Sequence, residues 1–413
     1  MSTFTPAVFI GIGGAGLHIL LRIRRLIVEN YKKLENLPSV RFLHMDTSEQ
    51  MGPDAGVNIP LEVLGQSLQF KDAERCIISH KINDEIRQSL DSIKANPTVK
   101  DWFDSSLPLD NNFSQGAGGI RPYGRLAFHY AVDMFRQKVG NCLVEASNPT
   151  NAQKTAEVLD MTLGTGLDVY IVCSLMGGTG SGTFLEVCYN TRAAVKGKIK
   201  APDLTGVFII SGADVDSRRK ANCYSALMEM EYHATQALLG KTHFTARYPI
   251  PDITLIQESK PPVEICYLAS HLGEGGYALG RDQMEEAIAL NLFMEFGSTI
   301  SEEKKIRRTD FTSIEAFHQP DEELKRSRQF LSFGITTLEF PAPRVQDMMA
   351  HELAAYAVKG WLFAEKKESP DRILRAPQME AIRDEFCPGQ ALTAAFLTLA
   401  VFWLRLWFVN RLA

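Results

Sequence analysis

Three short glycine-rich turns are the stretches whose residue types and spacing point most directly to chemistry. They read GIGGAG at 11–16, GAGG at 116–119 and GGTGSG at 177–182. Each precedes a helical pattern, and main-chain N–H groups at a helix start attract anions. Glycines let the main chain approach an anion closely, because no Cβ is in the way. One such turn is equally well explained by helix packing, but three favour a polyphosphate ligand.

The elements that position these turns are predicted to form a parallel α/β sheet. Strands are predicted at 7–13, 40–48, 167–176, 204–211 and 263–270. Helical patterns with apolar residues three and four apart follow several of them, which gives the βαβ order typical of a parallel sheet. One helix is predicted near 81–95. Beyond the sheet, the sequence predicts a long helix, then a strand at 330–341 and an amphipathic helix from about Arg344.

Composition excludes several classes of function. The chain has 44 Lys and Arg against 49 Asp and Glu, a formal charge of −5, so it lacks the basic surplus of a nucleic-acid binder. Its seven cysteines form no CxxC pair and fit reduced thiols buried in a core. The histidines show no HxH or HExxH spacing, so no dedicated metal site is predicted. The start of the chain lacks a signal-peptide pattern, which predicts a cytoplasmic protein.

The first turn also satisfies the dinucleotide pattern GxGxxG. Gly11, Gly13 and Gly16 match it, and Asp46 follows about thirty residues later as a possible ribose acceptor. A dinucleotide-binding enzyme is therefore an open alternative, although this motif does not explain the two later turns. A P-loop is excluded, because no lysine follows Gly182.

The last residues, 391–413, form a strongly apolar segment interrupted by Arg405. Its uninterrupted part, 391–404, is shorter than the roughly 20 residues that a spanning helix needs. Two interpretations stay open. The segment is a buried or partner-facing helix, or it is a membrane segment or a cut into a longer protein.

The turns taken together resemble those of the tubulin/FtsZ superfamily. GGTGSG resembles the signature GGGTG[ST]G, with Met176 in place of the first glycine. GIGGAG is similar to the superfamily's first glycine loop, and GAGGIRPYGR resembles the FtsZ loop GAGxNPxxG. The stretches ANCYSALMEMEYH and FLSFGITTLEFP look more like bacterial tubulin-like proteins than like eukaryotic tubulin or FtsZ. The match covers roughly residues 6–300 by the order of elements.

The resemblance implies a Rossmann-like GTPase domain at 1–280, a central helix at 281–301 and a reduced or truncated α+β second domain at 302–413, with an apolar C-terminal helix. It implies GTP or GDP as ligand, although the choice of GTP over ATP rests on the family alone. Mg²⁺ would be carried by the nucleotide, with no side-chain ligand of its own. The residues expected to contact the phosphates through main-chain amides, or through the hydroxyls of the Thr and Ser, are Gly13, Gly14, Ala15, Gly16, Ala117, Gly118, Gly119, Gly177, Gly178, Thr179, Gly180, Ser181 and Gly182.

Side-chain contacts to the nucleotide are also implied. Asp46 is included among the nucleotide-binding residues. Asp214 and Arg218 resemble the acidic and basic pair that FtsZ directs at ribose and terminal phosphate, or else they are a solvated helix cap and its neighbour. Asp282 lies where the superfamily places an Asp or Asn against the guanine edge.

In the superfamily, acidic residues from the next subunit complete the catalytic site. The usual sequence, close to N-x-D-x-x-D, is absent after Phe296, and the nearest candidates are Asp310 and Glu315. Arg121 and Arg125 stand beside the second turn. They bind the γ-phosphate, as an arginine finger does, or they pair with carboxylates on a neighbouring helix.

The sequence therefore predicts a bacterial tubulin/FtsZ-like GTPase of cytoskeletal type that assembles head to tail with itself, into filaments or oligomers. The main alternative is a nucleotide-binding scaffold that does not hydrolyse GTP and is tethered to a membrane or a partner protein by the C-terminal segment.

Overall fold

The computed structural model describes residues 3–50, 59–88, 90–108, 113–197, 199–200, 202–212, 215–249, 255–271, 278–297, 330–333 and 348–354. By its internal contacts the chain divides into two units, Met1–Ile335 and Thr336–Ala413. In the second unit the described residues, 348–354, are helical. All elements discussed below belong to the first unit.

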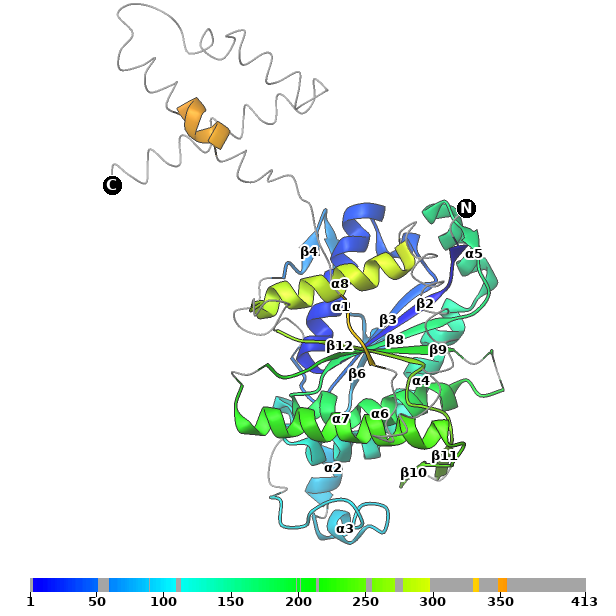
Figure 1. Cartoon of the computed structure of the whole chain (residues 1–413), viewed down its shortest axis with the longest axis vertical. Coiled ribbons are helices and arrows are strands. Elements are labelled where there is room, and N and C mark those ends of the chain that lie inside the picture. Colours follow the sequence, from blue (N-terminus) through cyan, green and yellow to red (C-terminus); the bar gives the residue numbers. More distant parts are fainter. Residues whose placement is uncertain are drawn as a thin grey trace, which may run out of the picture. The chain divides into compact units, whose positions relative to one another are not determined.

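A seven-stranded sheet runs through the centre of the first unit (Figure 1), in the order β13-β12-β9-β8-β2-β3-β6. All neighbouring strands are parallel. Chain order runs outward in both directions from the neighbours β2 and β8, so the point where it reverses lies between them, where α/β proteins bind ligands. The strands are β2 (Ala7–Ile12), β3 (Val40–Asp46), β6 (Arg75–Ile77), β8 (Asp168–Ser174), β9 (Asp203–Ile209), β12 (Ile265–Ala269) and β13 (Phe330–Leu331).

Helices cover both faces of the sheet (Figure 1). One face carries α1 (Gly13–Tyr31) and α8 (Arg281–Gly297). The opposite face carries α4 (Arg121–Ala146), α6 (Gly178–Ala194) and α7 (Ser217–Leu238). The remaining helices of this unit are α2 (Ser79–Gln88), α3 (Leu90–Ala95), α5 (Pro149–Leu159) and the short 3-10 turns η1 (Leu34–Asn36), η2 (Asp72–Glu74) and η3 (Phe113–Gln115). This arrangement confirms the predicted parallel α/β fold.

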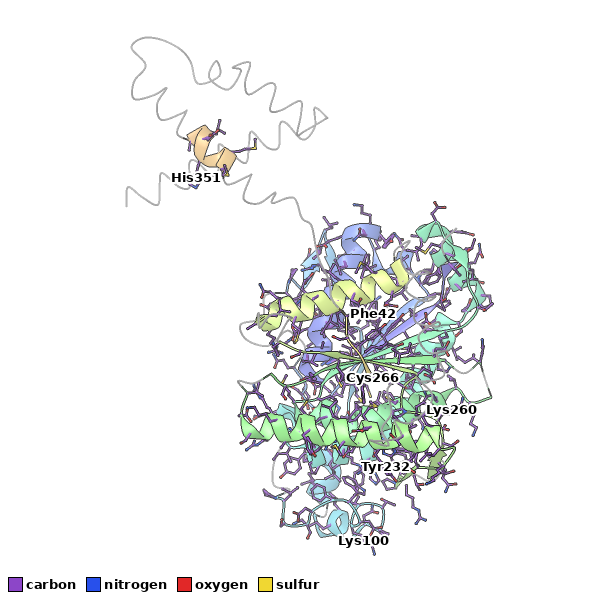
Figure 2. The ribbon with its side chains drawn as sticks, viewed as in Figure 1. Phe42, Lys100, Tyr232, Lys260, Cys266 and His351 are labelled. Atoms are coloured by element: carbon purple, nitrogen blue, oxygen red, sulfur yellow. The ribbon has the colours of Figure 1, made fainter. Side chains whose placement is uncertain are left out.

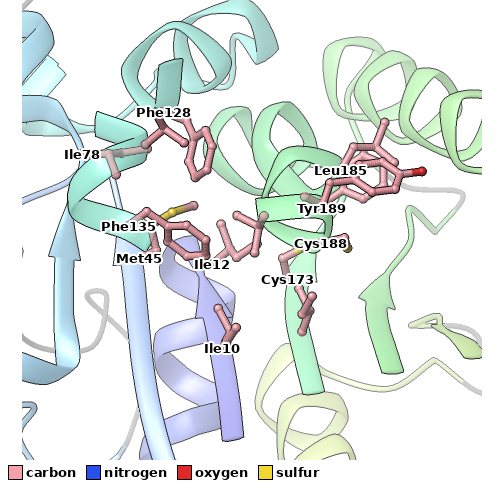
Figure 3. Packing of buried hydrophobic residues seen from close by; sticks show 14 of the residues in the cluster. Ile10, Ile12, Met45, Ile78, Phe128, Phe135, Cys173, Leu185, Cys188 and Tyr189 are labelled. Atoms are coloured by element: carbon pink, nitrogen blue, oxygen red, sulfur yellow. The ribbon is translucent and has the colours of Figure 1, made fainter. Parts of the chain in front are cut away.

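Side chains of the central strands alternate between two apolar cores. On β2, Ile10 and Ile12 face the helices α4 and α6, and Figure 3 shows them packed among Phe135, Met45 and Cys173. Phe9 points the opposite way, toward α1 and α8, and stacks on Tyr170 with ring centroids 5.0 Å apart. This alternation follows from the two-residue period of a strand. Both faces of β2 are buried, which explains its continuous apolar sequence.

The structure refines several predicted elements. The helix predicted near 81–95 is two helices, α2 and α3. Three short strand pairs were not predicted, because each is only two to four residues long. They are β1 (Thr3–Phe4) with β7 (Thr162–Leu163), β4 (Glu62–Val63) with β5 (Gln66–Ser67), and β10 (Phe244–Arg247) with β11 (Leu255–Glu258).

One strand lies in a different part of the fold from that predicted. The stretch at 330–341 was assigned to the second domain, but its described part, β13, pairs with β12 as the seventh strand of the main sheet. The registers are Cys266 with Phe330 and Tyr267 with Leu331. The assignment failed because a parallel partner can return after a long connection, and chain distance alone does not reveal it.

The six described cysteines are all buried and unpaired, as predicted, and Figure 2 shows Cys266 within the layers of the fold. In the part of the chain that the structure covers, no helix is both long enough and apolar enough to cross a membrane. The apolar segment at 391–413 lies outside the described residues.

Candidate phosphate-binding site

The first and third glycine turns lie side by side at the carboxyl edge of the sheet. β2 ends at Ile12 and α1 begins at Gly13, while β8 ends at Ser174 and α6 begins at Gly178. Because β2 and β8 are neighbours, a Cβ on Gly13 would lie 3.9 Å from the Gly180 nitrogen. The two turns therefore share one site at the reversal point of the sheet.

The second turn approaches the third from α4. A Cβ on Gly178 would lie 2.7 Å from the Ile120 nitrogen and 2.9 Å from the Ala117 Cβ. A Cβ on Gly124 of α4 would overlap the main-chain carbonyl of Gly178, and one on Gly182 would overlap that of Arg121. The first turns of α4 and α6 thus cross with their main chains in contact. All three glycine turns meet in one place, as the sequence predicted.

The glycines of these turns fall into two groups. Several allow close packing: Gly11 against Gly16, Gly180 against the Ser174 carbonyl, and the α4–α6 crossing described above. The expectation that packing would not account for these turns was therefore too strong. In contrast, a Cβ on Gly177 or Gly118 would meet no described atom within 4 Å. These two positions, with Gly13 at φ +71°, are where the main chain is open to a ligand.

Three helices begin at this site without a side-chain cap. The N-cap residues of α1, α4 and α6 are Ile12, Ile120 and Gly177; none makes a side-chain capping bond, and no acidic residue lies in the three first turns. Elsewhere in the described chain, Asn148 caps α5 and Asp216 caps α7. Uncapped first-turn N–H groups and the positive ends of three helix dipoles therefore converge here, an arrangement that favours an anion.

Two of the predicted side chains form a buried polar cluster beneath the main-chain site. Thr179 donates its hydroxyl to the Asp46 Oδ1 at 3.2 Å, and its Oγ1 lies 2.7 Å from that of Thr47. Asp46 Oδ1 also accepts from the Thr47 main-chain N–H at 2.7 Å. The Asp46 carboxylate therefore has internal partners, which weakens the case for it as the ribose acceptor of a dinucleotide enzyme. Thr47 was not predicted.

Burial sets the protonation of this cluster. It raises the pKa of Asp46 from 3.8 to about 6, even though hydrogen bonds to the carboxylate oppose the shift. It lowers the pKa of His44, whose Nε2 lies 3.3 Å from the Gly13 carbonyl, to about 4. At neutral pH His44 is therefore uncharged, and its 4.0 Å approach to Asp46 Oδ2 is not an ion pair.

The hydroxyl of Ser181 does not face the open positions. It donates to the Gly177 carbonyl, one turn earlier in α6, and the residue is fully buried. Such back-bonding is common for serine within helices. The predicted phosphate contact of Ser181 therefore rests on its main-chain N–H and not on the hydroxyl in this arrangement.

α7 supplies side chains to two of the glycine turns. Asn222, which was not predicted, donates from Nδ2 to the Gly119 carbonyl at 2.9 Å and to the Met176 carbonyl at 3.0 Å. Arg218 is exposed and reaches the Gly118 carbonyl at 3.4 Å. Asp214, its predicted acidic companion, lies outside the described residues. A sequence signal for Asn222 existed, since it is an amide one turn beyond Arg218 in a helix that starts at the site.

Both arginines beside the second turn pair with carboxylates on neighbouring helices, which is the second of the two interpretations given for them. Arg125 Nε lies 2.9 Å from Glu186 Oε1, and the guanidinium sits 4.3 Å over the Trp102 ring. Burial raises the pKa of Glu186, and the charge of Arg125 opposes this. Arg121 donates to the Ser181 carbonyl at 2.9 and 3.1 Å and pairs with Glu229 at 2.6 Å.

Asp282, in the first turn of α8, forms an ion pair. Its Oδ1 lies 2.9 Å from Nη2 of Arg22 on α1, and its side chain is half exposed. Its predicted role at the guanine edge stays a prediction. The predicted catalytic residues Asp310 and Glu315 lie outside the described residues. In the described part of the chain, no group of three His, Cys, Asp or Glu side chains is arranged to hold a metal ion.

The fold and site define an α/β protein of doubly wound type in which three lysine-free glycine turns meet at the reversal point of the sheet. The chain belongs to the tubulin-like family, whose sequence model, described as "Tubulin like", matches residues 8–359. This confirms the resemblance to the tubulin/FtsZ superfamily. A search of curated proteins found no match.

Solved tubulin-like structures are similar at low identity. CetZ1 from Haloferax volcanii, a GDP-bound monomer, is 15% identical over 73% of this chain and 63% of its own, with a TM-score of 0.39. CetZ2 from Haloferax volcanii, a GTPγS-bound protofilament, is 13% identical over 72% of this chain and 59% of its own, with a TM-score of 0.38. TubZ from Clostridium botulinum phage c-st is 13% identical over 73% of this chain and 65% of its own, with a TM-score of 0.37. The chain thus spans less than two thirds of each.

Proposed function

We propose that this protein binds a guanine nucleotide by its phosphates and assembles head to tail with itself as a GTPase of the tubulin type. The observation that carries the proposal is the convergence of three uncapped helix N-termini, those of α1, α4 and α6, at the reversal point of the sheet. A polyphosphate supplies the negative charge that these helix ends lack.

The donor set suits a nucleotide that brings its own cation. The described loops offer main-chain N–H groups, and the carboxylate that binds Thr179, Asp46, already accepts three hydrogen bonds. No lysine lies in the turns at 11–16, 116–119 or 177–182. When bound, Mg²⁺ would neutralise charge between the β- and γ-phosphates, the task that a lysine performs in a P-loop.

The proposal also covers the choice of base, self-assembly and hydrolysis. Guanine specificity is supported by family membership and by the guanine nucleotides named for CetZ1 and CetZ2. Assembly is supported by the protofilament of CetZ2. For hydrolysis, Asp310 and Glu315 are the proposed acidic residues, supplied by the next subunit.

The primary test is to identify the nucleotide that co-purifies with the protein and to measure its affinity for GTP, GDP, ATP and NAD. Phosphate release and sedimentation are then followed against protein concentration. Release per subunit that rises with concentration supports assembly-coupled hydrolysis. Tight GTP binding without release or pelleting supports a non-hydrolysing scaffold, and bound NAD contradicts both.

A variant tests the helix N-terminus directly. Gly177 is the N-cap of α6 at φ −84° and ψ 170°, where an aspartate fits without strain and caps the helix with its own carboxylate. Gly177→Asp is expected to weaken GDP binding by more than about 100-fold without lowering the melting temperature. Gly177→Asn, of the same shape but neutral, is the control and is expected to lose much less affinity. Equal losses would show that the charge at this helix end does not determine the affinity for GDP.

A further inference from the structure

Asn222 joins two separate glycine turns from a third helix. Its side chain is 8% exposed, and both hydrogen atoms of the amide nitrogen are used, one on the Gly119 carbonyl and one on the Met176 carbonyl. The Gly119 carbonyl belongs to the last residue of the second turn, and the Met176 carbonyl belongs to the residue directly before the third. The Asn222 side chain binds neither of the two open glycines, Gly118 and Gly177, but the residues whose carbonyls it binds, Gly119 and Met176, are their neighbours in the chain.

The two carbonyls control the direction of the neighbouring N–H groups. In a trans peptide the C=O and the following N–H lie in one plane and point in opposite directions, and no described peptide is cis. Holding the Met176 carbonyl toward α7 therefore turns the Gly177 N–H away from α7. The Gly119 carbonyl belongs to the same peptide unit as the Ile120 N–H, which closes the turn onto the Ala117 carbonyl at 2.9 Å.

The second turn needs such a tether. Gly116, Gly118 and Gly119 have φ values of +104°, +58° and +73°, a conformation that costs more backbone entropy to fix than an ordinary loop. The N-cap of α4 makes no side-chain bond that would hold the turn from that helix. The Asn222 bond is shorter than the 3.4 Å contact from Arg218, so it is the stronger of these two links to α7.

We infer that Asn222 is a positioning residue that holds the second and third glycine turns in register, so that phosphate affinity depends on α7. The inference rests on the proposed nucleotide binding. Asn222 would not touch the nucleotide. It acts by presenting the main-chain N–H groups of two turns at a fixed separation, and without it a polyphosphate must order them itself, at a cost in affinity.

The test compares Asn222→Ala with wild type in binding GMP, GDP and GTP. Alanine suits a helix and leaves both carbonyls without their donor. We expect at least about a tenfold loss of affinity for GDP and GTP, and a smaller loss for GMP, because longer phosphate chains engage more of the two turns. The matched control is Asn190→Ala. Asn190 is also a buried amide, and it donates to the Glu186 carbonyl and the Tyr248 hydroxyl, away from the turns.

A second variant separates positioning from general damage. In Asn222→Asp the carboxylate faces two carbonyls without a donor, whereas its protonated form regains one. GDP affinity relative to wild type is expected to recover as the pH falls from about 8 to about 5.5, while the Asn222→Ala ratio stays constant. If the alanine variant does not fold, this recovery of GDP affinity in Asn222→Asp still tests the positioning role of Asn222.

The outcomes are distinct. If wild type binds no nucleotide, the proposed function fails and the inference fails with it. If wild type binds GDP but Asn222→Ala matches wild type or matches Asn190→Ala in its affinity for all three nucleotides, the inference is overturned and the proposed function stands. A constant ratio for Asn222→Asp across the pH range also overturns it.

Discussion

The helix pairs on the two faces of the sheet are held together by different means. On one face, α4 and α6 touch through their main chains, because Gly124, Gly178 and Gly182 leave no side chain between them. On the other face, α1 and α8 share an apolar core and are also joined by long charged side chains. Arg22, 3% exposed, meets Asp282, Glu285 and Glu286 at 2.9 to 3.2 Å.

The two kinds of contact differ in how much movement they allow. A main-chain contact has no rotamers, so α4 and α6 keep one relative position, and two of the glycine turns are carried on them. A charged contact with several alternative partners permits small shifts, because each side chain can exchange one partner for another. We therefore expect a rigid phosphate site on one face and an adjustable α8 on the other.

The largest effect is expected from Gly124→Val. A branched side chain would enter the α4–α6 crossing, where even a Cβ overlaps the Gly178 carbonyl. We expect a loss of more than about 5 kcal/mol in the free energy of unfolding, comparable with the whole stability of many domains. Urea unfolding or failure to obtain soluble protein measures it. Wild-type stability in this variant would show that the helices can separate and that their main-chain contact is not rigid.

On the opposite face, Glu285→Ala is expected to cost about 4 kcal/mol, because Glu285 is 1% exposed and its loss removes a buried partner from both Arg22 and His18. Chemical denaturation measures the change. The control is Asp282→Asn, since Asp282 is half exposed and its ion pair is expected to contribute less than about 1 kcal/mol. Equal costs would mean that burial does not govern this network.

The Asp282→Asn variant also tests whether Asp282 contacts the guanine base, because such a contact predicts weaker GTP binding in the variant.

A pH-dependent effect is expected at the glycine-turn site from Asp46→Asn. The folded protein holds the Asp46 proton more tightly than the unfolded chain, because the pKa is about 6 instead of 3.8. The stability that Asp46 contributes is therefore complete below about pH 4 and is lost as the pH rises through about 6, by at most about 3 kcal/mol. The variant lacks this loss, as unfolding curves between these pH values would show.

The control for that experiment is Asp216→Asn at the exposed cap of α7. Hydrogen bonds from the main chain lower the pKa of Asp216, the opposite direction, so this variant is expected to keep the wild-type decline between about pH 4 and pH 6. Parallel profiles for wild type and Asp46→Asn would mean that Asp46 is not the group that titrates.

The smallest effect is expected from Gly140→Ala, in the same helix as Gly124. A Cβ here meets the Ala194 carbonyl at 3.8 Å, an ordinary contact. The variant is expected to gain about 0.5–1 kcal/mol, because alanine replaces glycine inside a helix. A thermal melt suffices. A loss of stability instead would mean that α4 and α6 are packed as tightly at Gly140 as they are at Gly124.

The order of the elements and the meeting of the three glycine turns were predictable from sequence. The spacing of apolar residues predicted which stretches form strands and helices, and parallel strands bring their carboxyl ends to one edge of the sheet. The separate tasks of the glycines were not predictable, since Gly177 and Gly178 are adjacent in the chain and one is open while the other is packed. Asn222 and Thr47 were missed because their partners are main-chain carbonyls and a hydroxyl distant in sequence. The partners of Arg121 and Arg125 could not be predicted either, because they too are distant in sequence.

The placement of β13 has a practical consequence for work with shortened versions of the chain. A version that ends at residue 301, after the predicted central helix, would remove Phe330 and Leu331 and leave β12 with an unpaired edge. Bare sheet edges pair with other molecules and promote aggregation. Pelleting of such a version would imitate filament assembly. A version that extends through residue 335 retains the seventh strand and gives a cleaner baseline for sedimentation.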